Sequence, residues 1–227
     1  MKKKLKITIA SFTPYLKDVD DRILKKYLEN EGAQVDIISW TDENYEWVKS
    51  DAVIIRSTWD FHQTINQYLD WLDNLKRQKI LVFNDVDIVK DNIKKDKQIK
   101  WLKENNISIM DCEVFSIYDK TMQFPEKSLK ETIKKHLPDH YGKSLFVLKP
   151  TISARSTNTF LVDPFNINQD ENNHISPNEE ELFQELLTKF NDRGLILQVY
   201  ANGIKDGEYG IVFLNNVMVQ SVVKMPG

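Results

Sequence analysis

A lysine near the end of an apolar segment is the first residue in this chain that could do chemistry. Lys149 lies in the run Val147-Leu148-Lys149-Pro150, and small hydroxyl residues follow it, from Thr151 through Ser153 to Thr159. Such a lysine offers a phosphate group a point charge, and the loop behind it offers backbone and hydroxyl donors. From this segment alone, a strand-end lysine that reaches solvent before an ordinary turn is an equally good interpretation.

A second candidate is the segment Gln198-Val199-Tyr200, which is followed by Gly207-Glu208. An extended backbone that lies over a flat base can hold adenine through alternating C=O and N–H groups, without special side chains. An interior strand followed by a turn explains the same residues. Taken alone, that structural interpretation is the better one.

The third candidate is a lysine-rich helix start, where Lys94, Lys95 and Lys97 follow Asn92. A lysine at this point could reach the same phosphates from the opposite side. In isolation, a solvated run of charges is the better interpretation.

Other kinds of site are disfavoured by the composition. Cys112 is the single cysteine, which leaves neither a disulfide framework nor a cysteine zinc site. Pro138 lies between His136 and His140 and breaks the helix that would align them, so two loop histidines are a better interpretation than a metal pair. The 7 glycines form neither a Walker A loop nor a G-x-G-x-x-G turn.

The charge and hydropathy of the chain narrow its partners. A net charge of −3 gives no reason to expect nucleic acid or an anionic membrane as a partner. No apolar run approaches the about 20 residues of a membrane span. We therefore expect a cytoplasmic protein.

Alternating strands and helices must position the candidates of the first hundred residues. β-branched runs and helical apolar spacing alternate here, which predicts an α/β fold with a parallel sheet. The expected strands cover residues 7–12, 35–40, 52–56 and 80–84, and the expected helices cover 20–31, 65–75 and 90–103. The loop from Arg56 to His62 then follows a strand at the carboxyl edge of the sheet, where ligands bind in such folds.

The second half of the chain predicts a different arrangement. Short strands are expected at residues 113–117, 144–149 and 195–200, and helices at 129–137 and 179–191, with a surface loop at 163–178. Asn215-Asn216 joins residues 211–214 and 217–223 into a hairpin, because asparagine tolerates positive φ. The second strand of that hairpin is apolar on both faces, so we expect it to be covered on both sides.

The order of these motifs resembles the ATP-grasp superfamily, and in particular its glutathione-synthetase-like branch, which includes the cyclo-ligase of cycloserine biosynthesis. The resemblance runs from about residue 5 to the end of the chain. It rests on five motifs in order. The first two are a loop similar to Arg-Ser-x-Trp-Asp-Tyr at Arg56–Phe61 and an asparagine after the fourth strand, Asn84. The others are a Lys-Pro-x-x-Ser-Ala stretch ending in Asn-Thr at Lys149–Thr159, a Gln-x-Tyr hinge with Gly-Glu at Gln198–Glu208, and a closing Lys-x-Pro at Lys224–Pro226.

The resemblance implies a pre-ATP-grasp domain over residues 1–90, followed by an incomplete ATP-grasp fold. That fold would consist of a small subdomain over 91–143 and a truncated central ATP-binding domain with an antiparallel sheet over 144–227. Arg56 and Asp60 would help to bind the acceptor substrate, and Lys224 would belong to the same catalytic set. The implied phosphate contacts are Lys149, Ser153, Thr159 and a second lysine, for which Lys97 is favoured over Lys94 and Lys95. Adenine would be held by Gln198, Val199 and Tyr200. Glu208 would bind the ribose.

The activity implied by the resemblance is ligation of a carboxylate to an amine through an acyl phosphate, with ATP and Mg²⁺. The family's magnesium ligands follow the Lys-x-Pro-Gly turn, so we expect them beyond residue 227 and negligible activity without that segment. A second copy or a complementing C-terminal chain would then cover the apolar hairpin. The alternatives are an inactive nucleotide-binding or scaffold protein, or one half of a split ligase. In addition, the phosphate loop has Arg155 and Ser156 where relatives often have glycine or alanine, so the sequence does not decide whether this loop closes over the phosphates.

Overall fold

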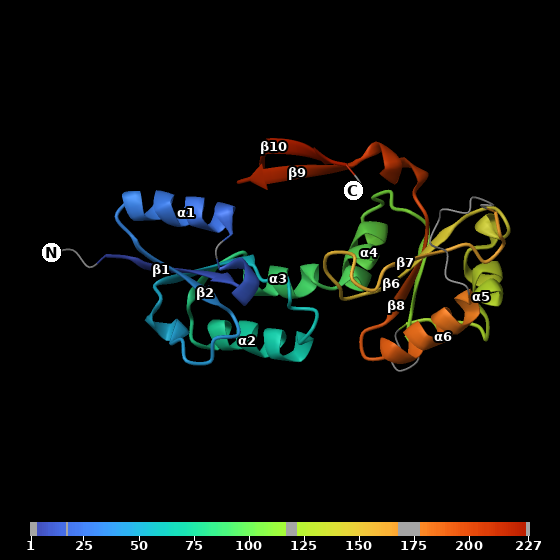
Figure 1. Ribbon diagram of the computed structural model, residues 1–227, viewed down its shortest axis with the longest axis horizontal. Coiled ribbons are helices and arrows are strands. Elements are labelled where there is room, and N and C mark those ends of the chain that lie inside the picture. The colour runs from blue at the N-terminus through green and yellow to red at the C-terminus, as the bar shows by residue number, and fades with distance from the viewer. Residues whose placement is uncertain (1–3, 17, 117–121, 168–177, 226–227) are drawn as a thin grey trace. The chain divides into compact units, whose positions relative to one another are not determined.

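The computed structural model describes residues 4–16, 18–116, 122–167 and 178–225, and these form two compact units (Figure 1). The first unit contains residues 1–107 together with 151–158, and the second contains 108–150 and 159–227. The predicted boundaries at residues 90 and 143 are not tested by this division and stay predictions. None of the helices in the described part of the chain is long and apolar enough to cross a membrane.

The first unit has the predicted parallel sheet, with strand order β2-β1-β3-β4. Apolar residues of helix α1 pack on one face of the sheet, and those of α2 and α3 pack on the other, which gives three layers (Figure 1). The elements are β1 (Lys6–Ser11), α1 (Val19–Asn30), β2 (Gln34–Ser39), β3 (Ala52–Ser57), α2 (Ile65–Arg77), β4 (Leu81–Phe83), α3 (Val86–Asn92) and α4 (Lys95–Glu104), with short 3₁₀ turns at Thr13–Tyr15 and Trp47–Lys49.

The helix expected over residues 90–103 was wrong, because two helices occupy this region. Asp85 caps α3 by accepting from the backbone N–H groups of Asp87 and Ile88, so that helix begins earlier than the lysine-rich run. Lys94 has extended backbone angles and separates α3 from α4. The break is stabilised by a contact that is distant in sequence, since the backbone N–H of Lys95 donates to the carbonyl of Thr151 at 3.0 Å.

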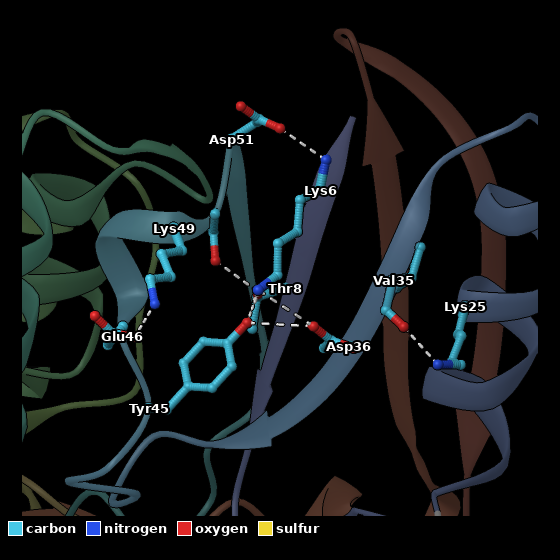
Figure 2. A network of polar contacts seen from close by, with 10 residues as sticks. Lys6, Thr8, Lys25, Val35, Asp36, Tyr45, Glu46, Lys49 and Asp51 are labelled. Carbon is cyan, nitrogen blue, oxygen red and sulfur yellow. Dashed lines mark hydrogen bonds and ion pairs between the residues drawn. The ribbon is translucent and has the colours of Figure 1, made fainter. Parts of the chain in front are cut away.

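A polar network stabilises the central strand of this sheet, as Figure 2 shows. The hydroxyl of Thr8 is fully buried and shares hydrogen bonds of 2.7 Å with both Tyr45 Oη and Ser50 Oγ. Lys6 ties the same strand to Asp51 through its backbone N–H and to Asp36 through its amine. The buried hydroxyls of Thr8 and Ser50 therefore each have a partner, as is usual for polar groups in the interior.

Replacing Thr8 by valine should lower the free energy of unfolding by about 1–3 kcal/mol, because Tyr45 and Ser50 lose a buried partner. Urea denaturation followed by circular dichroism measures this. The matched control is Glu46→Gln, which breaks an exposed ion pair with Lys49 and should change stability by less than about 1 kcal/mol. Equal stability of the Thr8 variant and wild type would show that the network is not stabilising.

The second unit has the expected antiparallel sheet, with strand order β5-β8-β6-β7. Helices α5 and α6 pack on one face around a core that includes Phe146, Leu148, Phe183 and Leu197 (Figure 1). The elements are β5 (Cys112–Phe115), α5 (Leu129–His136), β6 (Phe146–Pro150), β7 (Phe160–Val162), α6 (Glu179–Lys189) and β8 (Leu195–Val199), with 3₁₀ turns at Pro138–His140 and Asn202–Asp206. Parts of the expected strand 113–117 and loop 163–178 lie outside the described residues.

The hairpin is present as predicted, with strands β9 (Glu208–Leu214) and β10 (Val217–Lys224). Asn215 and Asn216 both have positive φ, at 49° and 63°, as the turn requires. The large apolar side chains of both strands are exposed in this structure, among them Phe213, Val217 and Val219. The expected cover on both sides of the hairpin stays a prediction.

Candidate functional site

One face of the second unit's sheet carries half-buried side chains. Side chains alternate along β6, so that Phe146, Leu148 and Pro150 are buried while Val147 and Lys149 on the other face are half-buried. The register places Val147 opposite both Gln198 of β8 and Leu161 of β7. This set, Val147, Lys149, Leu161 and Gln198, is called the open face below.

Lys149 and Gln198, which the sequence places in separate motifs, meet on the open face. The Lys149 amine donates a 2.6 Å hydrogen bond to Gln198 Oε1. Burial lowers the pKa of the Lys149 amine below its ordinary value, although the neighbouring Cys112 thiol opposes the shift. Because an amide is neutral, this pairing leaves the lysine charge without a carboxylate among the described residues, and a phosphate would supply the missing negative charge.

A cavity of about 210 Å³ lies at the end of the open face. It has two lysines and no carboxylate among its lining residues, which are Lys143, Ser144, Leu145, Leu161, Ile167, Tyr200, Asn202 and Lys205. The cavity therefore combines an apolar wall with positive charge and polar groups at its rim.

The predicted adenine hinge lies beside this cavity, but only part of its backbone can bind a base. Strand β8 pairs with β5 on one side and β6 on the other, so it is the interior strand that the sequence also allowed. The N–H groups of Val199 and Tyr200 donate to the carbonyls of Asp111 and Leu145, and the Val199 side chain packs in the core. Among the described residues, the Tyr200 carbonyl and the Ala201 N–H have no backbone partner, which moves the candidate hinge one residue further along.

Three other predicted residues are exposed, and in the described part of the chain no hydrogen bond or ion pair joins them to the Lys149–Gln198 pair. Glu208 and Lys224 lie opposite each other at the open end of the hairpin. Thr159 precedes β7 and is exposed as well. Their predicted roles stay predictions.

The first unit carries a second cavity, of about 560 Å³, at the carboxyl ends of β3 and β4. The cavity is called the acceptor pocket below, after the predicted role of Arg56. Its lining comes from both strand ends, α3, α4 and the 151–158 segment, and includes Arg56, Thr58, Trp59, Asn84, Lys95, Gln98 and Ser153. Arg56 and Lys95 are cationic, and no carboxylate is among its lining residues. The position agrees with the general rule for ligand sites in parallel sheets.

Lys95 is the lysine that the structure brings to the small-residue loop. Its amine donates to the carbonyl of Ser153 at 2.8 Å and to Ser153 Oγ at 2.9 Å. Lys97, the favoured candidate, instead forms an exposed ion pair with Asp91. The contact with Ser153 thus makes Lys95 a further candidate, and the role predicted for Lys97 stays a prediction.

Asp60 is held by an aromatic cluster and is not among the residues that line the acceptor pocket. Trp40 Nε1 donates to Asp60 Oδ1 at 2.7 Å, and Trp40 packs edge-on against Tyr68. Burial raises the pKa of Tyr68 to about 12, so its hydroxyl stays protonated and shares a hydrogen bond with Thr58. The bond from Trp40 to Asp60 therefore ties the loop that carries Thr58 and Trp59 to this aromatic cluster.

Two features of this edge were not expected from the sequence. Ser11 lies in register with both Ser39 and Ser57, which forms a buried row of hydroxyls at the carboxyl ends of three strands. Asp21 of α1 is fully buried and pairs with Arg56. Among the described residues there is no group of three or more His, Cys, Asp and Glu side chains that could hold a metal ion.

Comparison with known proteins supports the architecture. Residues 7–84 match the family model of the D-cycloserine synthetase DcsG N-terminal domain. A search of curated proteins finds no match. Because the matched segment is about a third of the 227-residue chain, it bears on the first unit only.

Solved structures extend the likeness to the whole chain. The crystal structure of D-cycloserine synthetase DcsG is similar with a TM-score of 0.75 and 15% identity, over 97% of this chain and 68% of that one. A RimK domain ATP-grasp protein from Sphaerobacter thermophilus gives 0.60 and 11%, over 90% and 67%. Carboxyaminoimidazole ribonucleotide synthase from Aspergillus clavatus, complexed with ATP, gives 0.59 and 13%, over 99% of this chain and 55% of that one.

Proposed function

We propose that this chain, an ATP-grasp relative in fold, binds ATP on the open face of its second unit and belongs to a ligase that joins a carboxylate to an amine. The observation that carries the proposal is the half-buried Lys149 amine, whose partner is the neutral Gln198 amide. A cation that has lost part of its hydration and lacks a carboxylate partner is suited to bind an anion. The similarity to ATP-grasp structures, one of them in complex with ATP, supports ATP as that anion.

The residues of the second unit fit the parts of the nucleotide. Lys149 would bind the α- and β-phosphates. The apolar wall formed by Leu145 and Leu161 would lie against adenine, whose edge would meet the Tyr200 carbonyl and the Ala201 N–H. Glu208 would bind the ribose hydroxyls, and the described residues provide no ligand set that we assign to Mg²⁺.

In the proposed reaction, ATP supplies the phosphoryl group that activates a substrate carboxylate as an acyl phosphate. The amine substrate then attacks the acyl carbon, and inorganic phosphate leaves. Positioning and charge neutralisation are the protein's part in such a transfer. Arg56 would hold the carboxylate substrate, and Lys149 would neutralise charge on the phosphates.

A second candidate is a nucleotide-binding protein without ligase activity. In the loop after Lys149, Arg155, Ser156 and Asn158 have positive φ angles of 54°, 56° and 56°. Asparagine tolerates this conformation, but side chains such as those of Arg155 and Ser156 pay a steric cost of about 1–2 kcal/mol per residue. A loop with such residues is less suited to close over phosphates than a glycine-rich one.

Isothermal titration with the ATP analogue AMP-PNP, with and without Mg²⁺, tests the proposed function. We expect saturable binding with one nucleotide per chain. Phosphate release from ATP in the presence of a panel of carboxylates and amines would favour the ligase, because a nucleotide-binding protein without ligase activity does not produce it. The absence of AMP-PNP binding at millimolar concentration in both conditions would contradict both.

The affinity for AMP-PNP should also depend on pH through Lys149. Burial favours the neutral amine, so Lys149 loses its proton at a lower pH than the ordinary lysine value of 10.5. The protonated amine is the form that attracts phosphate, and affinity should therefore fall as pH rises through this lowered pKa. The variant Lys149→Met should lack this fall, and identical pH profiles for the two proteins would show that Lys149 does not bind the nucleotide.

A further inference from the structure

Asp21 has no role in the nucleotide site, yet its surroundings are unusual for an acidic residue. It lies in the first turn of α1, and its side chain is fully buried. Its Oδ1 atom accepts a 3.0 Å hydrogen bond from Arg56 Nε. Its Oδ2 atom is buried as well and has no hydrogen-bond partner among the described residues.

A purely stabilising role does not explain this pairing well. Burial of a carboxylate removes its hydration, and one hydrogen-bonded partner offsets only part of that free-energy cost. The cost is larger for Asp21 because its second oxygen is buried without a partner. The positive end of the α1 dipole offsets some of it. A buried carboxylate oxygen without a partner calls for an explanation, and a role in a binding site is one.

The contact with Asp21 fixes the direction of the Arg56 guanidinium. The Arg56 side chain is 40% exposed and lines the acceptor pocket. Because Asp21 occupies Nε, both Nη groups are left without a partner among the described residues. Two parallel N–H groups of one guanidinium match the two oxygens of a carboxylate.

The remaining walls of the pocket describe the rest of the ligand. Trp59 and Ile88 are partly exposed and line the pocket together with Phe61 and Val89. Lys95 is the second cation, and the lining residues include no carboxylate. This combination favours a small organic acid with an apolar part over a free phosphate ion, which would leave the apolar walls unused.

We propose that Asp21 is a positioning residue, which holds Arg56 so that the acceptor pocket binds the carboxylate of a small acid with an apolar part. The assignment of this acid as the ligase substrate rests on the proposed function. The binding itself requires no nucleotide, so it can fail or succeed independently of AMP-PNP binding.

The test uses the full chain with phenylacetate as the probe, and phenylacetamide and inorganic phosphate as the neutral and the inorganic comparisons. The readout is the ¹⁵N–¹H signal of the Trp59 indole, which is identified among the 5 tryptophans with the variant Trp59→Phe. Phenylacetate should shift this signal, whereas phenylacetamide should not at the same concentration. A response to phosphate alone, or to none of the probes, would overturn the proposal.

The role of Asp21 is isolated by a double-mutant cycle. Asp21→Asn should weaken phenylacetate binding about tenfold in the wild-type background, as expected when a charge-assisted contact is misaligned, and should have no further effect in Arg56→Met. The matched control is Asp20→Asn, which removes one exposed charge from the same helical turn and should leave the affinity unchanged. Equal effects of Asp21→Asn in both backgrounds, or unchanged affinity in the wild-type background, would overturn the positioning role.

A second variant keeps the test decisive if Asp21→Asn does not fold, which urea denaturation monitors. Arg56→Lys retains the positive charge but loses the Nε contact and the paired Nη groups. It should lose the affinity for phenylacetate about as fully as Arg56→Met. Retained affinity in Arg56→Lys would show that charge alone, without positioning, accounts for binding.

Discussion

Replacing Lys149 by alanine should weaken binding of AMP-PNP about tenfold or more. The physical reason is the loss of a charge-assisted contact to phosphate, which contributes roughly 1.5–3 kcal/mol. The variant should still fold, because the Lys149 amine has only the Gln198 amide as its partner among the described side chains, and that amide is half-buried and can be hydrated. Isothermal titration at fixed ionic strength measures the change.

The matched control for this variant is Lys127→Ala. Lys127 is an exposed lysine of the same unit, and its backbone carbonyl accepts from Gln184, a contact that the substitution leaves in place. Both variants lose one positive charge, so a general electrostatic effect on nucleotide binding would weaken them equally. Equal affinities of wild type and Lys149→Ala would remove the residue on which the proposed site depends.

Replacing Phe183 by alanine should have the largest effect on stability, a loss of about 3–5 kcal/mol in the free energy of unfolding. Phe183 is fully buried on α6, in the core that supports the face of the sheet opposite to Lys149. The cavity left by the missing ring would loosen β6 and β8, which position Lys149 and Gln198. AMP-PNP binding should therefore weaken together with stability.

Urea denaturation followed by near-ultraviolet circular dichroism measures the Phe183 effect. The control is Glu185→Ala on the exposed side of α6, which should change stability by less than about 0.5 kcal/mol. If Phe183→Ala unfolded at the same urea concentration as wild type, the second unit would not depend on this core.

The sheets of both units could be predicted from the sequence because their signals are local. β-branched runs separated by amphipathic helices predict the parallel sheet, and the Asn215-Asn216 turn predicts the hairpin. Lys149 and Gln198 each lie in an expected strand, but only the pairing of the two strands shows that they meet.

The remaining features depend on contacts between residues far apart in sequence. The break between α3 and α4 is stabilised by the bond from Lys95 to Thr151, which no local propensity could indicate. The same contact distinguishes Lys95 from Lys97. Asp21 resembles an ordinary acidic residue of a helix start, and its significance appears only when the fold buries it against Arg56.

The central claim is that the nucleotide binds on the open face, and a chemical-shift map with AMP-PNP tests it most directly. In ¹⁵N-labelled protein, saturating AMP-PNP should shift the side-chain amide signals of Gln198 and the backbone amides of β6, β8 and Ala201. Amides of α5 and α6, on the opposite face of the same sheet, should change little. Shifts confined to the acceptor pocket, or an unchanged Gln198 side chain at saturation, would contradict the account.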